Sequence, residues 1–300
     1  MLSQLEEEVP WSEWVALVEP PYPNGEQGGP PVGVERRLRV SFLQPRFDLP
    51  DPAVEDALYE SPTMRSLVGI DPGGEPAPEE TTVCRFRHLL ERHGLGPQML
   101  TPGNGYLQRQ GLQPGTGAIV AATLLAAPSS TRNKSGQRDP EMHPVRKGKP
   151  WCFGRKAHGG VAAATRLIHS VAATAANVAD RRVLPELLHG EETEVWGDQA
   201  SPVQAEAIQQ RAPKAKVCTH RRWRSRLHVY PEVREQNRIQ SKTRSRVQHG
   251  LAVMMPRFGF TKVRYRGLAR NLNRLLSTCA LINLVTASKL LLAVPEQSCA

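Results

Sequence analysis

The stretch AIVAATLLAA, from Ala118 to Ala127, decides the fold of this 300-residue chain. A turn signal, PGTG at 114–117, precedes it, and Pro128 follows it. The run is short, apolar and partly β-branched, which predicts a strand buried on both faces of a sheet. Taken alone, it would indicate a core strand and nothing more.

The composition points to an acidic partner. The formal net charge is +10 and the pI is about 9.7, and nucleic acid is the commonest partner of such a chain. An ordinary basic protein is the alternative. Aromatic residues make up only 5% of the chain, which argues against a base-stacking single-strand binder.

Cysteine usage and the chain termini favour a reducing cytoplasm. The five cysteines are scattered singly with no Cys-x-x-Cys, so neither a zinc site nor a disulfide framework is indicated. The first residues are acidic and lack the apolar core of a signal peptide. The apolar stretch 275–294 contains Ser, Thr, Asn and Lys, which favours a buried amphipathic helix over a membrane span.

The first 110 residues predict an all-α domain. Apolar residues recur at helical spacing over 11–18, and a second helix is expected from 34 to 44, ended by Pro45. Asp51-Pro52 and Ser61-Pro62 each offer an N-cap oxygen followed by proline, which predicts two further helix starts. A fifth helix is expected over 81–93.

From residue 118 the pattern changes to that of a mixed sheet. Strands are expected over 118–126, 150–158, 167–174 and 194–197, with a β-like segment over 258–265. Helices are expected over 178–189, from 202, and over 268–292. The first of these helices would be capped by Asn177 and interrupted at Pro185. The segment 129–149 is expected to be a polar loop with several Lys and Arg. Antiparallel strands leading into alternating helices and strands suit a mixed sheet with helices on its faces.

Positive charge is concentrated in residues 211–250, which hold twelve Lys or Arg against two Glu. Such a block is either a solvated face or a phosphate-binding surface.

Several motifs, in collinear order over nearly the whole chain, resemble bacterial insertion-sequence transposases of the "IS-five" group. Those of the N-terminal helical domain are Asp51–Tyr59 and Glu80–Arg87. Those of the catalytic domain are Ala126–Ser130, Asp139–His143, Phe153–His158, Thr174–Val178, Gly197–Asp198 and Lys262–Ala269. The resemblance implies an α/β chain, with an N-terminal all-α domain over 1–110 followed over 115–295 by an RNase-H-like mixed sheet flanked by helices. The basic insert near 211–250 belongs to the second domain.

The resemblance also implies a metal site of three carboxylates. In this family they hold two Mg²⁺ ions, which activate one oxygen of a phosphodiester displacement and stabilise the other. Asp198 matches the second carboxylate and would be a metal ligand. Ala121 stands where the first Asp is expected, and Gln248 stands where the Glu is expected. Asp139 and Glu141 match a family motif outside the metal site. The chain therefore looks like a degenerate copy in which Mg²⁺ binding is doubtful.

By the same resemblance, the partner is double-stranded DNA carrying terminal inverted repeats, and the chain works as a homodimer at the nucleoid in the bacterial cytoplasm, with no membrane contact. The residues assigned to DNA are Arg221, Arg222, Arg224, Arg226, Arg244, Arg246, Lys262 and Arg264. Three hypotheses stay open. The chain is a transposase by ancestry with catalysis lost, a non-catalytic DNA-binding regulator of related elements, or a decayed reading frame.

Overall fold

The computed structural model describes most of the chain and separates it into two compact units. The described residues are 9–23, 32–71, 74–109, 111–112, 117–146, 148–197, 202–219, 235, 238–239, 241, 258–260 and 262–292. One unit comprises Met1–Gly111, Met254–Phe260 and Ala269–Ala300, and the other comprises Leu112–Val253 and Thr261–Leu268. Each unit has its own core and is described by itself.

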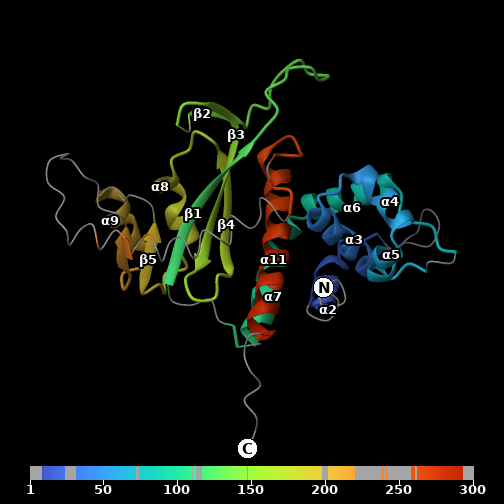
Figure 1. Ribbon diagram of the computed structural model, residues 1–300, viewed down its shortest axis with the longest axis horizontal. Coiled ribbons are helices and arrows are strands. Elements are labelled where there is room, and N and C mark those ends of the chain that lie inside the picture. The colour runs from blue at the N-terminus through green and yellow to red at the C-terminus, as the bar shows by residue number, and fades with distance from the viewer. Residues whose placement is uncertain are drawn as a thin grey trace, which may run out of the picture. The chain divides into compact units, whose positions relative to one another are not determined.

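The first unit is helical in all its described elements. These are α2 (Trp11–Val18), α3 (Val34–Phe47), α4 (Asp51–Glu60), α5 (Pro62–Val68), α6 (Glu80–Arg92), α7 (Leu95–Arg109) and nearly all of α11 (Leu268–Leu292) (Figure 1). Apolar residues of α3, α4, α5 and α6 form one core, in which Val54, Leu58 and Val68 are fully buried. The expected all-α character of this region is therefore confirmed.

Trp14 anchors α2 to its neighbours. Its ring stacks on Phe42 of α3 at a centroid distance of 4.6 Å, and its indole Nε1 donates a 3.0 Å hydrogen bond to the carbonyl oxygen of Met99 in α7. The buried tryptophan thus satisfies its one polar group while it fills the core.

The middle of helix α11 is buried, as the sequence predicted for this stretch, and residues 278–284 are buried without a break. Leu275, Cys279 and Ile282 are almost fully buried, and burial raises the pKa of the Cys279 thiol. Asn283 donates a 2.8 Å hydrogen bond to Asn104 of α7, so a buried polar group of this helix has a partner. Among the described helices, none is long and apolar enough to cross a bilayer.

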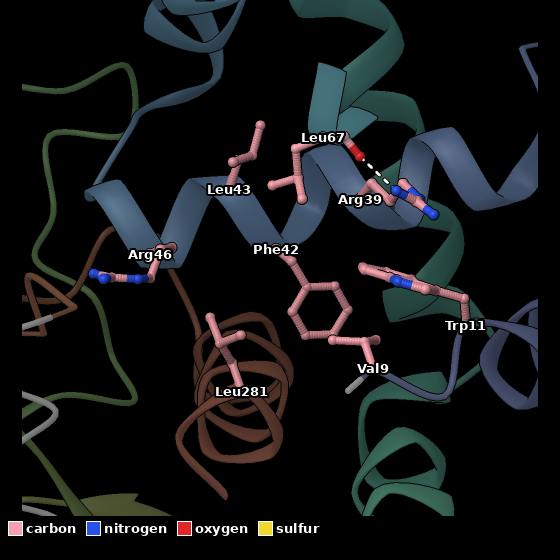
Figure 2. Close-up of a pocket in the computed structure, with 8 residues that line it drawn as sticks. All are labelled: Val9, Trp11, Arg39, Phe42, Leu43, Arg46, Leu67 and Leu281. Atoms are coloured by element: carbon pink, nitrogen blue, oxygen red, sulfur yellow. Dashed lines mark hydrogen bonds between the residues drawn. The ribbon is translucent and has the colours of Figure 1, made fainter. Parts of the chain in front are cut away.

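An apolar pocket in the helical unit is lined by α3, by residues from α5 and α11, and by Val9 and Trp11 at the start of α2. Figure 2 shows Phe42 and Leu281 facing its interior from two helices, with Trp11 at its rim. Arg39 donates a 2.7 Å hydrogen bond to the carbonyl oxygen of Leu67, and its guanidinium lies 4.9 Å from the Trp11 ring centroid. The Arg39 guanidinium is thus held by contacts with Leu67 and Trp11, and no carboxylate lines the pocket.

The second unit is built on a six-stranded mixed sheet. Its strands are β1 (Gly117–Ala126), β2 (His143–Arg146), β3 (Trp151–Ala162), β4 (Ile168–Ala175), β5 (Glu194–Gly197) and β6 (Lys216–Thr219). The order is β2-β3-β1-β5-β6, and β4 also pairs with β3. β1, β2, β3 and β4 pair antiparallel, whereas β5 and β6 run parallel to β1. This arrangement is the mixed sheet that the sequence predicted.

Helical segments connect the parallel strands. The turn of helix α8 (Asp180–Val183) and the 3-10 helix η1 (Leu184–Leu187) lead from β4 to β5, and α9 (Pro202–Arg211) leads from β5 to β6. Ala118, Leu184, Val195 and Ile208 share one hydrophobic cluster, so η1 and α9 pack on the sheet at β1 and β5. The alternation of helix and strand after β4 is what a parallel extension of a sheet requires.

Two strands were not predicted, and the burial of β1 was predicted wrongly. β2 lies inside the expected polar loop, and β6 lies inside the expected basic segment; both are four residues long. β1 is buried at Ile119 and Leu125, but it is exposed at Ala122 and half-buried between. The expected β-like segment over 258–265 forms only an isolated bridge between Lys262 and Ala126 in its described part.

The helix ends also differ from the expectation. α3 continues through Pro45 to Phe47, because a proline in the last turn removes only one hydrogen bond, and the helix then ends at Asp48 with φ 55°. α7 was missed because its Gly and Pro content hides the helical period. Pro185 does mark the change from α to 3-10 geometry, but the cap residue is Ala179 and not Asn177.

Of the two expected N-caps, only Ser61 acts as one. Its Oγ accepts the backbone N–H of Met64 at 3.3 Å. Asp51 instead lies inside α4, accepts 2.8 Å and 2.6 Å hydrogen bonds from Gln44 and Arg87, and makes no cap bond. The Asp51 and Arg87 side chains are 15% and 16% exposed, so this ion pair is largely shielded from water.

Asp51→Asn tests the ion pair between Asp51 and Arg87. Asparagine keeps the size of the side chain but has no charge to pair with Arg87, so we expect a loss of about 1.5 to 3 kcal/mol in unfolding free energy, measured by urea denaturation. Ser61→Asn is the matched control and should be nearly neutral. Equal stability of Asp51→Asn and the native chain would show that the ion pair contributes nothing.

Candidate functional site

The site that the resemblance implies lies on the central strand β1. Ala121 is half-buried there and pairs with Gly159 of β3. On the other side of β1, Ile119 pairs with Trp196 of the parallel strand β5. Asp198 and Gln248, the other two positions of the expected site, lie outside the described residues.

The residue at position 121 does not fit a metal ion. The methyl group of Ala121 offers no oxygen, whereas Mg²⁺ takes oxygen ligands. Over the described parts of the chain, no three His, Cys, Asp or Glu side chains are grouped so that they could hold a metal. The residue at the expected first ligand position thus has a side chain that cannot coordinate, and no catalytic step can be derived through a metal held there.

Asp139 and Glu141 are used for another purpose. Asp139 Oδ2 accepts the backbone N–H of Gly267 at 2.7 Å, and Glu141 Oε2 accepts that of Leu268 at 2.6 Å. Asp139 Oδ1 also accepts the N–H of Glu141 at 3.0 Å. The two carboxylates therefore satisfy free N–H groups at the start of α11, where negative charge is favourable. We call this pair of contacts the carboxylate clamp.

The KVRYRG motif before α11 is joined to the sheet and to the β1–β2 connection. The N–H of Val263 donates a 2.9 Å bond to the carbonyl oxygen of Ala126, at the end of β1. Arg266 donates to Ser135 Oγ at 2.8 Å and to the carbonyl oxygen of Arg138 at 3.2 Å. These contacts join residues about 130 positions apart, as the clamp does.

The structure describes two of the eight predicted DNA-binding residues, Lys262 and Arg264. Lys262 is exposed and Arg264 is half-buried. The other six, Arg221, Arg222, Arg224, Arg226, Arg244 and Arg246, lie outside the described residues. Arg266, which holds the β1–β2 connection, was not singled out from the sequence, although it belongs to the same KVRYRG motif.

His158 lies on β3 with a polar partner. Its Nε2 is 2.8 Å from Thr174 Oγ1 on β4, and its Nδ1 is 3.9 Å from a carboxylate oxygen of Asp180. Lys156 donates a 2.9 Å bond to the same carboxylate oxygen. Burial lowers the pKa of His158, the carboxylate of Asp180 opposes that shift, and the ammonium of Lys156 adds to it. The imidazole is thus held neutral as a structural group.

His169 on β4 also has a polar neighbour, since its Nδ1 is 2.8 Å from Ser170 Oγ. Its ring lies 5.3 Å from that of His189, and the buried carboxylate of Glu192 accepts the N–H groups of His189 and Gly190 at 2.7 and 2.8 Å. Burial and then the imidazole of His189 lower the pKa of His169 to about 4, and Glu192 opposes the shift.

Comparison with known proteins places the chain in a family. A family model described as "Transposase DDE domain" matches residues 113–284, and one described as "Transposase domain (DUF772)" matches residues 1–89. Since the first match alone covers more than half of the chain, this protein belongs to the DDE transposases, the family to which the insertion-sequence motifs pointed. Its function is therefore DNA transposition.

A solved structure supports the fold. The piggyBac transposase, in a cryo-EM synaptic complex with hairpin DNA, is 11% identical with a TM-score of 0.51, over 96% of this chain and 72% of that chain. At this identity the likeness concerns the fold alone. It confirms the expected architecture of a helical N-terminal region followed by an RNase-H-like mixed sheet.

The carboxylate clamp predicts a structural role for Asp139 and Glu141. The double substitution Asp139→Ala, Glu141→Ala should speed amide exchange at Gly267 and Leu268 and cost about 1 to 2 kcal/mol of stability. Asp139→Asn, Glu141→Gln keeps an acceptor oxygen at each position and should cost less. If Mg²⁺ slows amide exchange at Gly267 and Leu268 in the native chain but not in the double alanine variant, the two carboxylates are metal ligands instead.

The low pKa of His169 predicts a loss of stability in acid. Because its pKa is about 4 when folded and 6.5 as a free side chain, the unfolded chain binds more protons between these values, and stability rises with pH there. The native chain should lose about 2 kcal/mol between neutral pH and about pH 5 through this group. His169→Gln should flatten that part of the profile, while His93→Gln on the surface should not. Parallel profiles for native and His169→Gln chains would refute the assignment.

Proposed function

We propose that this DDE transposase binds the ends of its element without cleaving them. The observation that carries the proposal is the methyl group of Ala121 on the central strand, at the position where the family places its first metal-binding carboxylate. Gln248 replaces a second carboxylate, and a neutral amide does not offset the charge of two dications. Asp198 is the one member of the set that is retained in the sequence.

The register of the sheet supports the residue assignment. Ile119 of β1 and Trp196 of the parallel strand β5 are partners, and positions 121 and 198 each follow these partners by two residues. In our proposal position 198, which directly follows β5, therefore lies beside position 121 of β1. A restored carboxylate at 121 would thus have Asp198 as its neighbour in our proposal.

The proposed partner is double-stranded DNA with terminal inverted repeats, bound by a homodimer at the nucleoid in the bacterial cytoplasm. The family match and the net charge of +10 support DNA as the partner. The basic residues 221–226, with Arg244, Arg246, Lys262 and Arg264, are the contacts we propose for it. Divalent metal, which the family uses, would bind poorly because two ligands are replaced.

A regulatory activity follows if both units keep their folds. The helical unit and the sheet unit each have a packed core in their described parts. A chain that occupies element ends and cannot cut them would compete with an active copy of the same transposase. Purified chain added to such a copy should then reduce cleavage in proportion to end occupancy.

Restoring the carboxylates tests the proposal directly. On DNA carrying the matching ends with Mg²⁺, the native chain should be silent, and Ala121→Asp, Gln248→Glu should cut. Metal stabilisation of the transition state by several kcal/mol corresponds to a difference of about a thousandfold or more in rate.

Two comparisons complete the cleavage test. Ala121→Asn, Gln248→Glu adds a side chain of equal size without the charge and should stay silent. Cleavage by the native chain would refute the claim of inactivity. Silence of every variant, with binding intact, would show that loss of activity extends beyond the two replaced ligands.

A further inference from the structure

One end of the sheet carries a basic surface that the metal site does not include. It consists of side chains in the β1–β2 connection and around the turn from β2 to β3, which we name the basic end surface. Its members are Arg132, Lys134, Arg138, Arg146, Lys149 and Trp151, and all six are exposed. Figure 1 shows the β1–β2 connection extending beyond the end of the sheet next to β2.

The strand register brings these residues to the same end. Ala126, the last residue of β1, pairs with Gly154 of β3, which pairs in turn with His143 of β2. The connection after β1 and the turn between Arg146 and Trp151 both lie beyond that row. Arg138 bridges the two parts, because its guanidinium lies 5.7 Å from the ring centroid of Phe153.

The charge of this end is strongly positive. Residues 129–149 hold six Lys or Arg and two carboxylates, those of Asp139 and Glu141. Both carboxylates accept backbone N–H groups in the carboxylate clamp. Within the described residues, no ion pair neutralises Arg132, Lys134 or Lys149. Cations left without acidic partners at an exposed end attract phosphate.

The connection is held in place before any ligand binds. Asn133 Oδ1 accepts hydrogen bonds from the backbone N–H and the hydroxyl of Ser135 at 3.1 and 2.7 Å, and Asn133 Nδ2 donates to the carbonyl oxygen of Gln137 at 2.9 Å. Arg266, about 130 residues later in the sequence, adds its hydrogen bonds to the connection. A segment fixed in this way loses little conformational entropy on binding.

Trp151 gives the surface a second kind of contact. It is 69% exposed, the highest value among the exposed large hydrophobic side chains that the structure describes. It is the partner of Arg146 across the β2–β3 pair. An exposed indole beside cations is the combination that stacks on an unpaired base while phosphates are held nearby. A single tryptophan is not the multi-aromatic platform of a single-strand binder.

We propose that the basic end surface contacts DNA, with its Lys and Arg side chains on backbone phosphates and the Trp151 indole stacked on an unpaired base at a DNA end. This inference rests on the proposed function in that it requires the chain to bind DNA. It adds a contact surface, separate from residues 221–226, and a preference for an unpaired end.

Binding is measured by fluorescence anisotropy on the full chain, with two labelled probes: a blunt duplex, and the same duplex ending in unpaired nucleotides. Trp151→Ala should weaken binding to the unpaired-end probe by about ten- to a hundredfold and leave the blunt duplex nearly unchanged. Trp151→Phe keeps a ring and should restore most of the affinity. Melting curves establish that each variant is folded.

The contacts of Lys and Arg side chains with phosphates are tested by the salt dependence of DNA affinity. For Arg132→Ala, Lys134→Ala, the slope of log affinity against log salt should fall by about 2 on both probes, close to one per lost phosphate contact. The matched control, Arg181→Ala, Arg182→Ala, removes two exposed arginines from α8 and should leave the slope unchanged.

The outcomes separate this inference from the proposed function. If the native chain binds both probes and the variants behave as described, the surface is assigned. If the native chain binds and the Arg132, Lys134 and Trp151 variants have the same affinity and salt slope, the basic end surface does not contact DNA, although the chain binds it. The same conclusion follows if the salt slope of the α8 control falls equally. If the native chain binds neither these probes nor the element ends, the proposed function and this inference both fail.

Discussion

The arrangement of the sheet unit depends on the pairing of β1 with two neighbours of opposite direction. β3 pairs with it antiparallel over nine residue pairs from Ala118 to Ala126, and β5 pairs with it parallel from Gly117 to Ile119. Side chains alternate along a strand, so a shift of one residue in this register would turn Ile119 and Leu125 out of the core. The same register sets which residue faces the metal position and which residues reach the end of the sheet. Fold and site are therefore fixed by one set of backbone hydrogen bonds.

The sequence predicted those elements whose local pattern agrees with their final surroundings. β5, α6 and α11 have the apolar spacing of the structure they adopt, and α11 was predicted over its observed range, Leu268–Leu292. β2 and β6 are short edge or near-edge strands whose sequences, HPVR and KVCT, show no strand period of their own. They form because a neighbouring strand supplies hydrogen-bond partners, and a local pattern does not contain that information. α7 is the helical counterpart, since its glycines and prolines oppose the helix that packing against Trp14 favours.

The candidate site shows the same division between local and long-range information. The identity of residue 121 is read directly from the sequence once the family motif is aligned, and in our proposal it decides the chemistry. The role of Asp139 and Glu141 could not be read in this way, because their partners are the N–H groups of Gly267 and Leu268, more than 120 residues away. Two carboxylates so close in sequence suggest cation binding. In the structure they bind backbone amides instead of a cation, because the N-terminus of a helix favours negative charge.

The loss of metal-binding carboxylates that we propose is physically compatible with a retained fold. Carboxylates that converge on a metal repel one another when the metal is absent, so functional sites of this kind cost stability rather than supply it. Ala121 is half-buried and lies between the fully buried Ile119 and Leu125, which supply the hydrophobic contacts of β1. An Asp-to-Ala change at such a position removes charge and leaves those contacts in place. In our proposal, chemistry and folding thus rest on different side chains of one strand. The chemistry can then be lost while the fold, and the DNA-binding surface that we propose on it, remain.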